Sequence, residues 1–139
     1  MANAREIALM ALYKIEYEGA YSNMAVKDAL ATASGPDKGL ITELVYGVIR
    51  RKLTLDYVIS RYSKTKLKKL SKYLLLILRM GVYQIYFTEK IPDSAAVNES
   101  VKLAKKYCQK SAGFANAILH SVIRGRSTLE YPEDRNEFL

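Results

Sequence analysis

Apolar residues recur at helical spacing through residues 91–124, and this pattern constrains the fold more than any other feature of the chain. It comprises two stretches, and in each the spacing gathers the apolar residues on one helix face. Pro92 with Asp93 or Ser94 is suited to begin the first helix, and Ser111 to cap the second. The sequence therefore predicts two consecutive amphipathic helices. Their apolar stripes consist of Val97, Val101, Ala104 and Cys108, and of Phe114, Ala115, Ile118, Leu119, Val122 and Ile123.

The same periodicity continues towards the amino terminus and predicts about five further helices. The stretch from Tyr73 to Phe87 is apolar nearly all round, as expected for a helix at the centre of a bundle. No strand-like alternation and no internal repeat is recognisable. We therefore expect an all-α bundle of about seven helices. Helix caps, turns and ends are predicted at Asn3, Gly19, Ser22, Ser34, Thr54 and Ser71.

Length and cysteine content limit the class of protein. A chain of 139 residues, half of them hydrophobic, is expected to form one domain with its own core. The single cysteine, Cys108, cannot form an internal disulfide, which favours a reducing compartment such as the cytoplasm, and we expect a buried small hydrophobe there. The apolar run Tyr73–Phe87 is too short to span a membrane, and Met1–Arg5 shows no signal peptide.

Positive charge is concentrated in one segment. The net charge is +8, and nine basic residues lie between Arg50 and Lys72 with one acidic residue, Asp56, so the rest of the chain is neutral overall. A local basic surface of this kind suits a nucleic-acid backbone. A lysine-rich loop that only aids solubility explains the charge equally well, and both interpretations stay open here.

Catalytic chemistry has little support in the sequence. The only histidine, His120, has no neighbours at metal-ligand spacing, and the seven glycines form no nucleotide-binding loop. No Ser/His/Asp or Cys/His set is recognisable. We therefore predict no catalytic residue, no metal site and no cofactor site in this sequence, and the remaining candidates are binding residues.

Basic residues in helical context are the first candidate RNA contacts. Arg50, Arg51 and Lys52 can grip phosphates, although positive charge at a helix end also suits the helix dipole. Arg5 lies in a first helical turn, where a positive charge is mildly unfavourable, and this points to a role in binding. Arg79 lies within the most apolar helix, where it is either functional or, more commonly, paired internally.

A polar stripe on the last helix is the second candidate. Asn116, His120 and Arg124 stand at i, i+4 and i+8, opposite the apolar face. Asparagine and arginine can hydrogen-bond base edges or phosphates, and histidine can stack on a base. An ordinary solvated helix face explains the stripe about as well.

Six segments resemble one family in their amino-acid sequence as well as in their periodicity. They are Gly19–Asn23, Glu43–Arg51, Leu53–Tyr57, Leu78–Gln84, Ile91–Glu99 and Gly113–Leu119. Together they resemble the NusB fold, an all-helical RNA-binding domain. They are most similar to the amino-terminal domain of the RsmB (Sun/Fmu) methyltransferases, which modify cytosine-5 in small-subunit ribosomal RNA. His120 departs from the family pattern, which usually has a basic residue at this position.

The resemblance implies a helical RNA-binding domain over residues 1–124, followed by a polar linker or tail over residues 125–139. The tail would lead towards a catalytic domain outside this sequence. That other domain would hold S-adenosylmethionine and the family's catalytic cysteines, of which Cys108 is not one. The implied role of this chain is to help hold ribosomal RNA for methylation.

Two alternatives remain at this point. The length of the chain fits free-standing NusB, a transcription antitermination factor, and that resemblance implies antiterminator RNA and ribosomal protein S10 as partners. A protein–protein docking domain with a solubilising basic loop is the third interpretation. The length of the natural gene product would separate the first two, and salt-dependent RNA binding would separate both from the third. None of the three implies a membrane partner.

Overall fold

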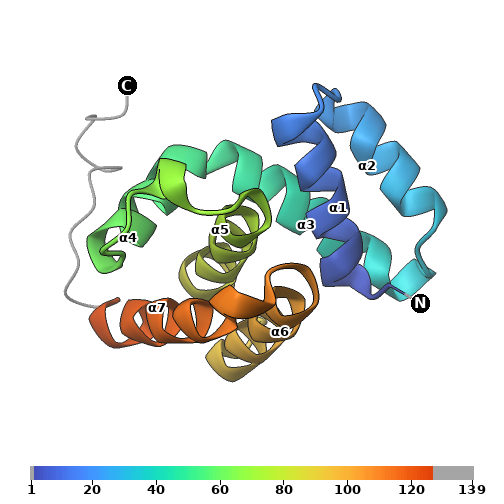
Figure 1. Cartoon of the computed structure of the whole chain (residues 1–139). Coiled ribbons are helices and arrows are strands. Elements are labelled where there is room, and N and C mark those ends of the chain that lie inside the picture. The colour runs from blue at the N-terminus through green and yellow to red at the C-terminus, as the bar shows by residue number, and fades with distance from the viewer. Residues whose placement is uncertain (1, 127–139) are drawn as a thin grey trace. The chain divides into compact units, whose positions relative to one another are not determined.

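The computed structural model describes residues 2–126, and within them all regular structure is helical (Figure 1). The predicted all-α fold of about seven helices is therefore confirmed. Two short 3-10 turns, η1 (Leu67–Lys69) and η2 (Gln109–Ser111), lie between helices. The α-helices are α1 (Ala4–Tyr17), α2 (Ser22–Ala31), α3 (Gly35–Arg50), α4 (Lys52–Tyr62), α5 (Lys72–Phe87), α6 (Asp93–Tyr107) and α7 (Ala112–Gly125).

The chain divides between Arg50 and Arg51 into two compact units. In the amino-terminal unit, α1 packs against α2 and α3, and Leu9, Ile41 and Leu44 are fully buried. The predicted Asn3 cap is present, because its Oδ1 accepts a hydrogen bond from the Glu6 backbone N–H at 2.9 Å. Gly19 follows the end of α1 with a φ of +76°, a conformation that favours glycine.

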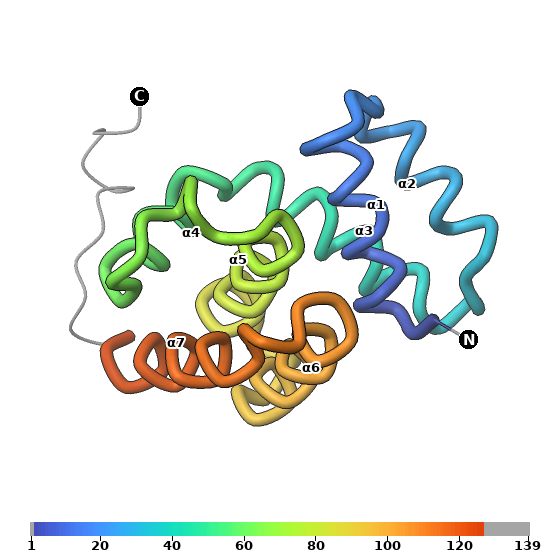
Figure 2. The backbone as a smooth tube through the Cα atoms, viewed as in Figure 1, coloured from blue at the N-terminus to red at the C-terminus, as the bar shows by residue number. Residues whose placement is uncertain are grey.

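The carboxy-terminal unit is built around α5, which packs against α4, α6 and α7 (Figure 2). Eleven of its residues are buried, as its apolar sequence predicts. At Gly81 of α5 the missing side chain lets α6 and α7 pack closely. A Cβ there would lie 2.9 Å from Leu119 Cδ2 and 3.0 Å from Ser100 Oγ. Ser71 caps α5 as predicted, since its Oγ accepts from the Leu74 backbone N–H at 3.2 Å.

Several local predictions were wrong. Thr54 does not begin α4, which starts at Lys52 and buries Thr54 in the core, where its side chain cannot serve as a cap. Ser22 is the first residue of α2 rather than its cap, and Ser111 precedes α7 without a side-chain capping bond. The last helix extends to Gly125, one residue into the predicted tail; residues 127–139 lie outside the described residues.

Cys108 also departs from its predicted place on the α6 stripe. It follows the last residue of α6 with a backbone that is neither helical nor extended (φ −153°, ψ 61°), and it is half-buried. Partial burial raises the pKa of its thiol, and a hydrogen bond with the Ser71 side chain acts in the opposite direction. In residues 2–126 none of the helices combines the length and the apolar character that crossing a membrane requires.

The central position of α5 predicts a large core contribution from Leu76, which is 1 % exposed. Leu76→Ala should lower the free energy of unfolding by about 2–5 kcal/mol, because it removes buried methyl groups and leaves a cavity. Leu53→Ala is the control: this leucine is 61 % exposed, and its loss should change stability by no more than about 0.5 kcal/mol. Chemical denaturation measures both values, and equal losses in the two variants would contradict the placement of α5.

Candidate nucleic-acid interface

An ion pair between α4 and α5 determines the charge that the basic segment presents to solvent. Arg79 Nε lies 2.7 Å from Asp56 Oδ1, and Arg79 Nη2 lies 2.9 Å from Asp56 Oδ2, so the pair is bidentate. Asp56 is the only acidic residue between Arg50 and Lys72. Asp56 therefore faces Arg79 of α5, and the nine basic residues of the segment outnumber its one carboxylate.

Arg79 itself is not placed to contact a ligand. It was a candidate RNA contact, but it is 4 % exposed and its guanidinium is held by Asp56. The structure therefore corresponds to the alternative of an internally paired arginine, which is the usual state of a buried charge. Arg79 positions α4 against α5, and we therefore no longer count it among the candidate RNA contacts.

Arg51, the first residue of the carboxy-terminal unit, lies over an aromatic ring. The guanidinium carbon of Arg51 lies 4.4 Å from the centroid of the Phe87 ring, close enough for a cation–π interaction. Phe87 ends α5, and Arg51 immediately precedes α4. Arg51 is exposed and Lys52 is half-buried, and each makes a further interaction within the protein.

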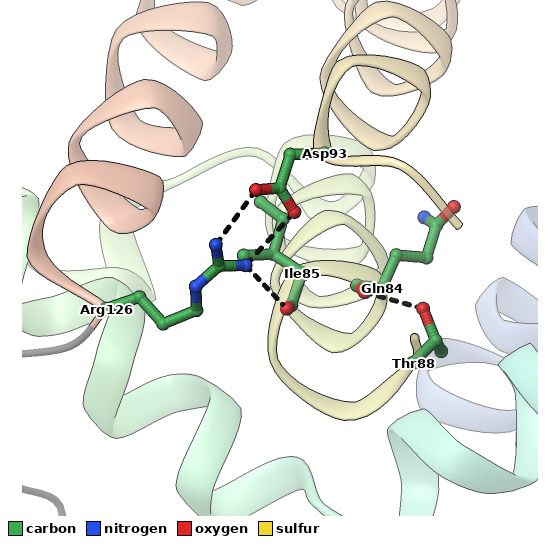
Figure 3. A network of polar contacts seen from close by, with 5 residues as sticks. All are labelled: Gln84, Ile85, Thr88, Asp93 and Arg126. Carbon is green, nitrogen blue, oxygen red and sulfur yellow. Dashed lines mark hydrogen bonds and ion pairs between the residues drawn. The ribbon is translucent and has the colours of Figure 1, made fainter. Parts of the chain in front are cut away.

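A second arginine, missed by the sequence analysis, holds the end of α7 (Figure 3). Arg126 donates from Nη1 and Nη2 to the two carboxylate oxygens of Asp93, each at 3.0 Å, and from Nη1 to the Ile85 carbonyl at 3.1 Å. The last turn of α7 is thereby tied to the beginning of α6 and the end of α5. Because Arg126 lies in the stretch predicted as a tail, no helical spacing singled it out.

The polar stripe predicted on α7 is present on its outer face. Asn116, His120 and Arg124 are all exposed, while Ala115, Ile118, Leu119 and Val122 of the same helix are buried. Arg124 Nη2 donates to the Ser121 Oγ at 3.1 Å. Within residues 2–126, the side chains of Asn116 and His120 have no hydrogen-bond partner. The stripe therefore offers hydrogen-bonding groups to solvent or to a ligand.

Asn116 also lies at the edge of a shallow polar hollow between α6 and α7. The hollow has a volume of about 500 Å³. Asn98, Glu99, Lys102 and Lys105 line it from α6, and Asn116 lines it from α7. Lys102 is paired with Glu99 at 3.2 Å. The Glu99 carboxylate offsets one of the two lysines, so the hollow offers two amides and the Lys105 ammonium to a polar ligand. The α6 residues were not among the predicted site residues.

The remaining two candidates belong to the amino-terminal unit. Arg5 lies in the first turn of α1, where it is half-buried, and it interacts with other residues of the protein. Arg50 is the last residue of α3 and is exposed. Arg51, Lys52, Asn116, His120 and Arg124 share the carboxy-terminal unit, so the structure assigns the predicted site residues to two units.

The chemistry of these residues is that of binding. Across residues 2–126, no group of three or more His, Cys, Asp or Glu side chains is placed to hold a metal ion. The candidate interface contains cations, amides and one imidazole. These groups can bind phosphate and hydrogen-bond to bases.

A family model described as the NusB family matches residues 2–124 of the chain. Two kinds of curated relatives are similar to it. The probable ribosomal RNA small subunit methyltransferase B of Bacillus subtilis is 40 % identical over 125 residues, which is 88 % of this chain but 28 % of that protein. The transcription antitermination protein NusB of Ruminiclostridium cellulolyticum is 38 % identical over 128 residues, covering 88 % of this chain and 87 % of the relative.

Solved structures show the same fold. NusB of T. maritima superposes with a TM-score of 0.79 at 25 % sequence identity, over 87 % of this chain and 88 % of that one. A chain from the crystal structure of antitermination factors NusB and NusE in complex with dsRNA gives a TM-score of 0.78 at 22 % identity, over 88 % of this chain and 94 % of that one. The NusB-like fold predicted from the sequence is therefore confirmed.

The buried pair between α4 and α5 predicts a large effect of removing its carboxylate. Asp56→Ala should lower the free energy of unfolding by about 3 kcal/mol, because the Arg79 guanidinium would stay in the core without its partner. Glu99→Ala removes the carboxylate of the surface pair with Lys102, whose side chain is 72 % exposed, and should cost less than about 1 kcal/mol. Urea unfolding of both variants tests the contrast, and similar losses would contradict the structural role of the Arg79–Asp56 pair.

Proposed function

The chain belongs to the NusB family, and we propose that it is the RNA-binding domain of a small-subunit ribosomal RNA cytosine-5 methyltransferase. The observation that carries this proposal is the outward basic segment of the carboxy-terminal unit, whose only acidic residue faces Arg79 in the core. The six sequence segments that resemble the methyltransferase domain, and the 40 % identity to the Bacillus subtilis relative, favour this choice within the family.

Each part of the candidate interface has a distinct role in the proposal. Arg50, Arg51 and Lys52 contact phosphates and set the orientation of the RNA. On α7, Asn116 hydrogen-bonds a base edge and His120 stacks on a base. Arg124 adds a phosphate or base contact at the end of the same stripe, and Arg5 contributes a phosphate contact from the amino-terminal unit.

Methyl transfer lies outside the role proposed for this chain. The chain spans 28 % and 24 % of the lengths of two small-subunit ribosomal RNA methyltransferases to which it is similar, those of Bacillus subtilis and a Synechocystis strain. In the proposal, S-adenosylmethionine binds to a separate catalytic domain, and the helical domain holds ribosomal RNA within its reach in the cytoplasm. Cys108 takes no part in the transfer, because its partial burial raises the pKa of the thiol and so disfavours the nucleophilic thiolate.

A second candidate function is that of a free-standing NusB, which would bind antiterminator RNA together with ribosomal protein S10. The 38 % identity to the NusB of Ruminiclostridium cellulolyticum supports it. The reading frame of the natural gene separates the two functions: a methyltransferase must continue into a catalytic domain. Co-purification with S10 from the native source would support the NusB function, whereas co-purification of 16S ribosomal RNA alone would support the methyltransferase.

RNA binding itself is tested by two substitutions that should act differently. Arg50→Gln should weaken binding of small-subunit ribosomal RNA fragments about equally for all sequences, and should reduce the slope of log K against log salt by roughly 0.7 on single-stranded RNA. Asn116→Ala should relax sequence preference and leave the salt slope nearly unchanged. Fluorescence anisotropy at several salt concentrations measures both properties.

The control variant is Lys27→Gln, which removes an exposed charge of α2 and should change neither property. Thermal unfolding of Asn116→Ala checks the competing structural role of this residue. A large loss of stability with unchanged RNA preference would argue against base recognition by Asn116. Absence of salt-dependent RNA binding in the unmodified protein would favour the protein–protein docking interpretation instead.

A further inference from the structure

In the proposed function, residues 61–72 of the basic segment have no individual contact assigned to them, and a second lysine-rich stretch lies near them in the carboxy-terminal unit. Two segments distant in sequence, residues 61–72 and 100–112, contain ten basic residues and no acidic one. We propose that the surface they form binds the phosphate backbone of duplex RNA without regard to sequence. This inference rests on the proposed function for the choice of RNA as the polyanion, and it assigns a ligand to the part of the basic segment that has no contact named there.

Two contacts bring these segments together at one end of α5. The rings of Tyr73 and Tyr107 lie 4.8 Å apart between centroids, and the side chains of Ser71 and Cys108 are hydrogen-bonded. The beginning of α5 therefore lies beside the end of α6, as can be followed in Figure 2. We call the lysines next to these contacts the lysine end. They are Lys66, Lys68, Lys69, Lys72, Lys105, Lys106 and Lys110.

The positive charge of the lysine end is open to solvent. All seven side chains are exposed. Five of them, Lys66, Lys68, Lys69, Lys105 and Lys110, form no ion pair with any residue in the range 2–126. Asp93 and Glu99, the acidic residues of α6, lie in its first half, and the structure pairs them with Arg126 and Lys102. The lysine end therefore has a strong positive potential, which favours a polyanionic ligand.

The helix dipoles destabilise the lysines before α5 and stabilise those at the end of α6. The amino-terminal end of a helix carries a partial positive charge, and acidic residues normally stabilise it. The first turn of α5 has no acidic residue and begins with Lys72, three residues after Lys69 and four after Lys68. Lys105 and Lys106 stand at the end of α6, where the dipole favours them. Stability therefore accounts for the α6 lysines but not for those before α5, and a bound phosphate group would be favoured at both.

The composition of the surface points to duplex rather than single-stranded RNA. Binding of single strands commonly uses exposed aromatic rings on which bases stack. At the lysine end, Tyr73 and Tyr107 are half-buried and face each other, so neither ring offers a free stacking platform. Lysine ammonium groups act as point charges on phosphates, and duplex RNA is recognised mainly through its shape and backbone. The lysine end has the groups for backbone contact and lacks those for stacking.

The test is a variant that removes three charges before α5, Lys66→Gln/Lys68→Gln/Lys69→Gln. A blunt-ended RNA duplex of about 16 base pairs, long enough for backbone recognition across successive grooves, is the probe. The variant should lose about tenfold in duplex affinity at low salt, and the slope of log K against log salt should become shallower by roughly 2 to 3. Its melting temperature should stay the same or rise, because repulsion near the positive end of α5 is reduced.

The matched control is Lys14→Gln/Lys27→Gln/Lys38→Gln, which removes the same charge from exposed lysines of the amino-terminal unit. It should change duplex affinity by less than about twofold, since only the weak long-range field is altered. A second variant, Lys105→Gln/Lys110→Gln, should also weaken duplex binding, because the two segments form one surface. Equal losses in the control and in the Lys66/Lys68/Lys69 variant, or no loss in the Lys105/Lys110 variant, would overturn the inference.

Failure of the inference and failure of the proposed function give different results. If the Lys66/Lys68/Lys69 variant binds the duplex as the unmodified protein does, while Arg50→Gln and Asn116→Ala still alter binding of ribosomal RNA fragments, only the inference fails. If the unmodified protein binds neither probe, both fail. Tighter binding to phosphatidylglycerol vesicles than to the duplex at the same salt concentration would overturn RNA as the ligand. Loss of duplex affinity with preserved sequence preference supports the inference.

Discussion

The ion pair between Arg79 and Asp56 is the contact on which the carboxy-terminal unit depends. The helix that carries Arg79 is buried along most of its length, and a guanidinium there without a partner would cost several kcal/mol. Asp56 supplies two acceptor oxygens from α4, and the bidentate geometry fixes how α4 lies against α5. The same contact neutralises the only acidic residue of the basic segment. This one pair thus affects both how α4 packs against α5 and how much negative charge remains within the basic segment.

Arginines and lysines have different roles in this unit: three arginines join helical elements, and most lysines remain in solvent. Arg79 binds Asp56, Arg126 binds Asp93 and the Ile85 carbonyl, and Arg51 lies over Phe87, so each of the three joins two helical elements. The planar, weakly hydrated guanidinium is suited to such partly desolvated contacts, whereas the strongly hydrated ammonium of lysine remains in water. The lysines accordingly provide most of the open positive charge. A polyanion bound mainly through lysine ammonium groups should dissociate readily as salt increases.

Local signals in the sequence predicted the helices and much of the core, but not the contacts between distant residues. Helical spacing identified α5 as central, and both Leu76 and Ile77 are fully buried. The caps at Asn3 and Ser71 were confirmed because a cap is formed within three residues. Arg126 was missed because its partners lie 33 and 41 residues away and no periodicity connects them. For Arg79 internal pairing was the expected state, yet the sequence could not name Asp56, which is 23 residues away.

The contacts that hold the helices together do not decide between the two kinds of relatives, since a NusB-like bundle needs the same packing in either. A preference for one RNA over another must come from exposed groups, and these groups are charged in some parts of the surface and neutral amides in others. Contacts of charged side chains with phosphates give affinity without sequence preference, while hydrogen bonds from amides to base edges can distinguish bases. Asn116 is exposed, has no hydrogen-bond partner among residues 2–126, and borders a hollow that Asn98, Glu99 and two lysines also line. This neutral amide is therefore where a preference for one RNA over another would arise, and the lysine end is where affinity for RNA in general would arise.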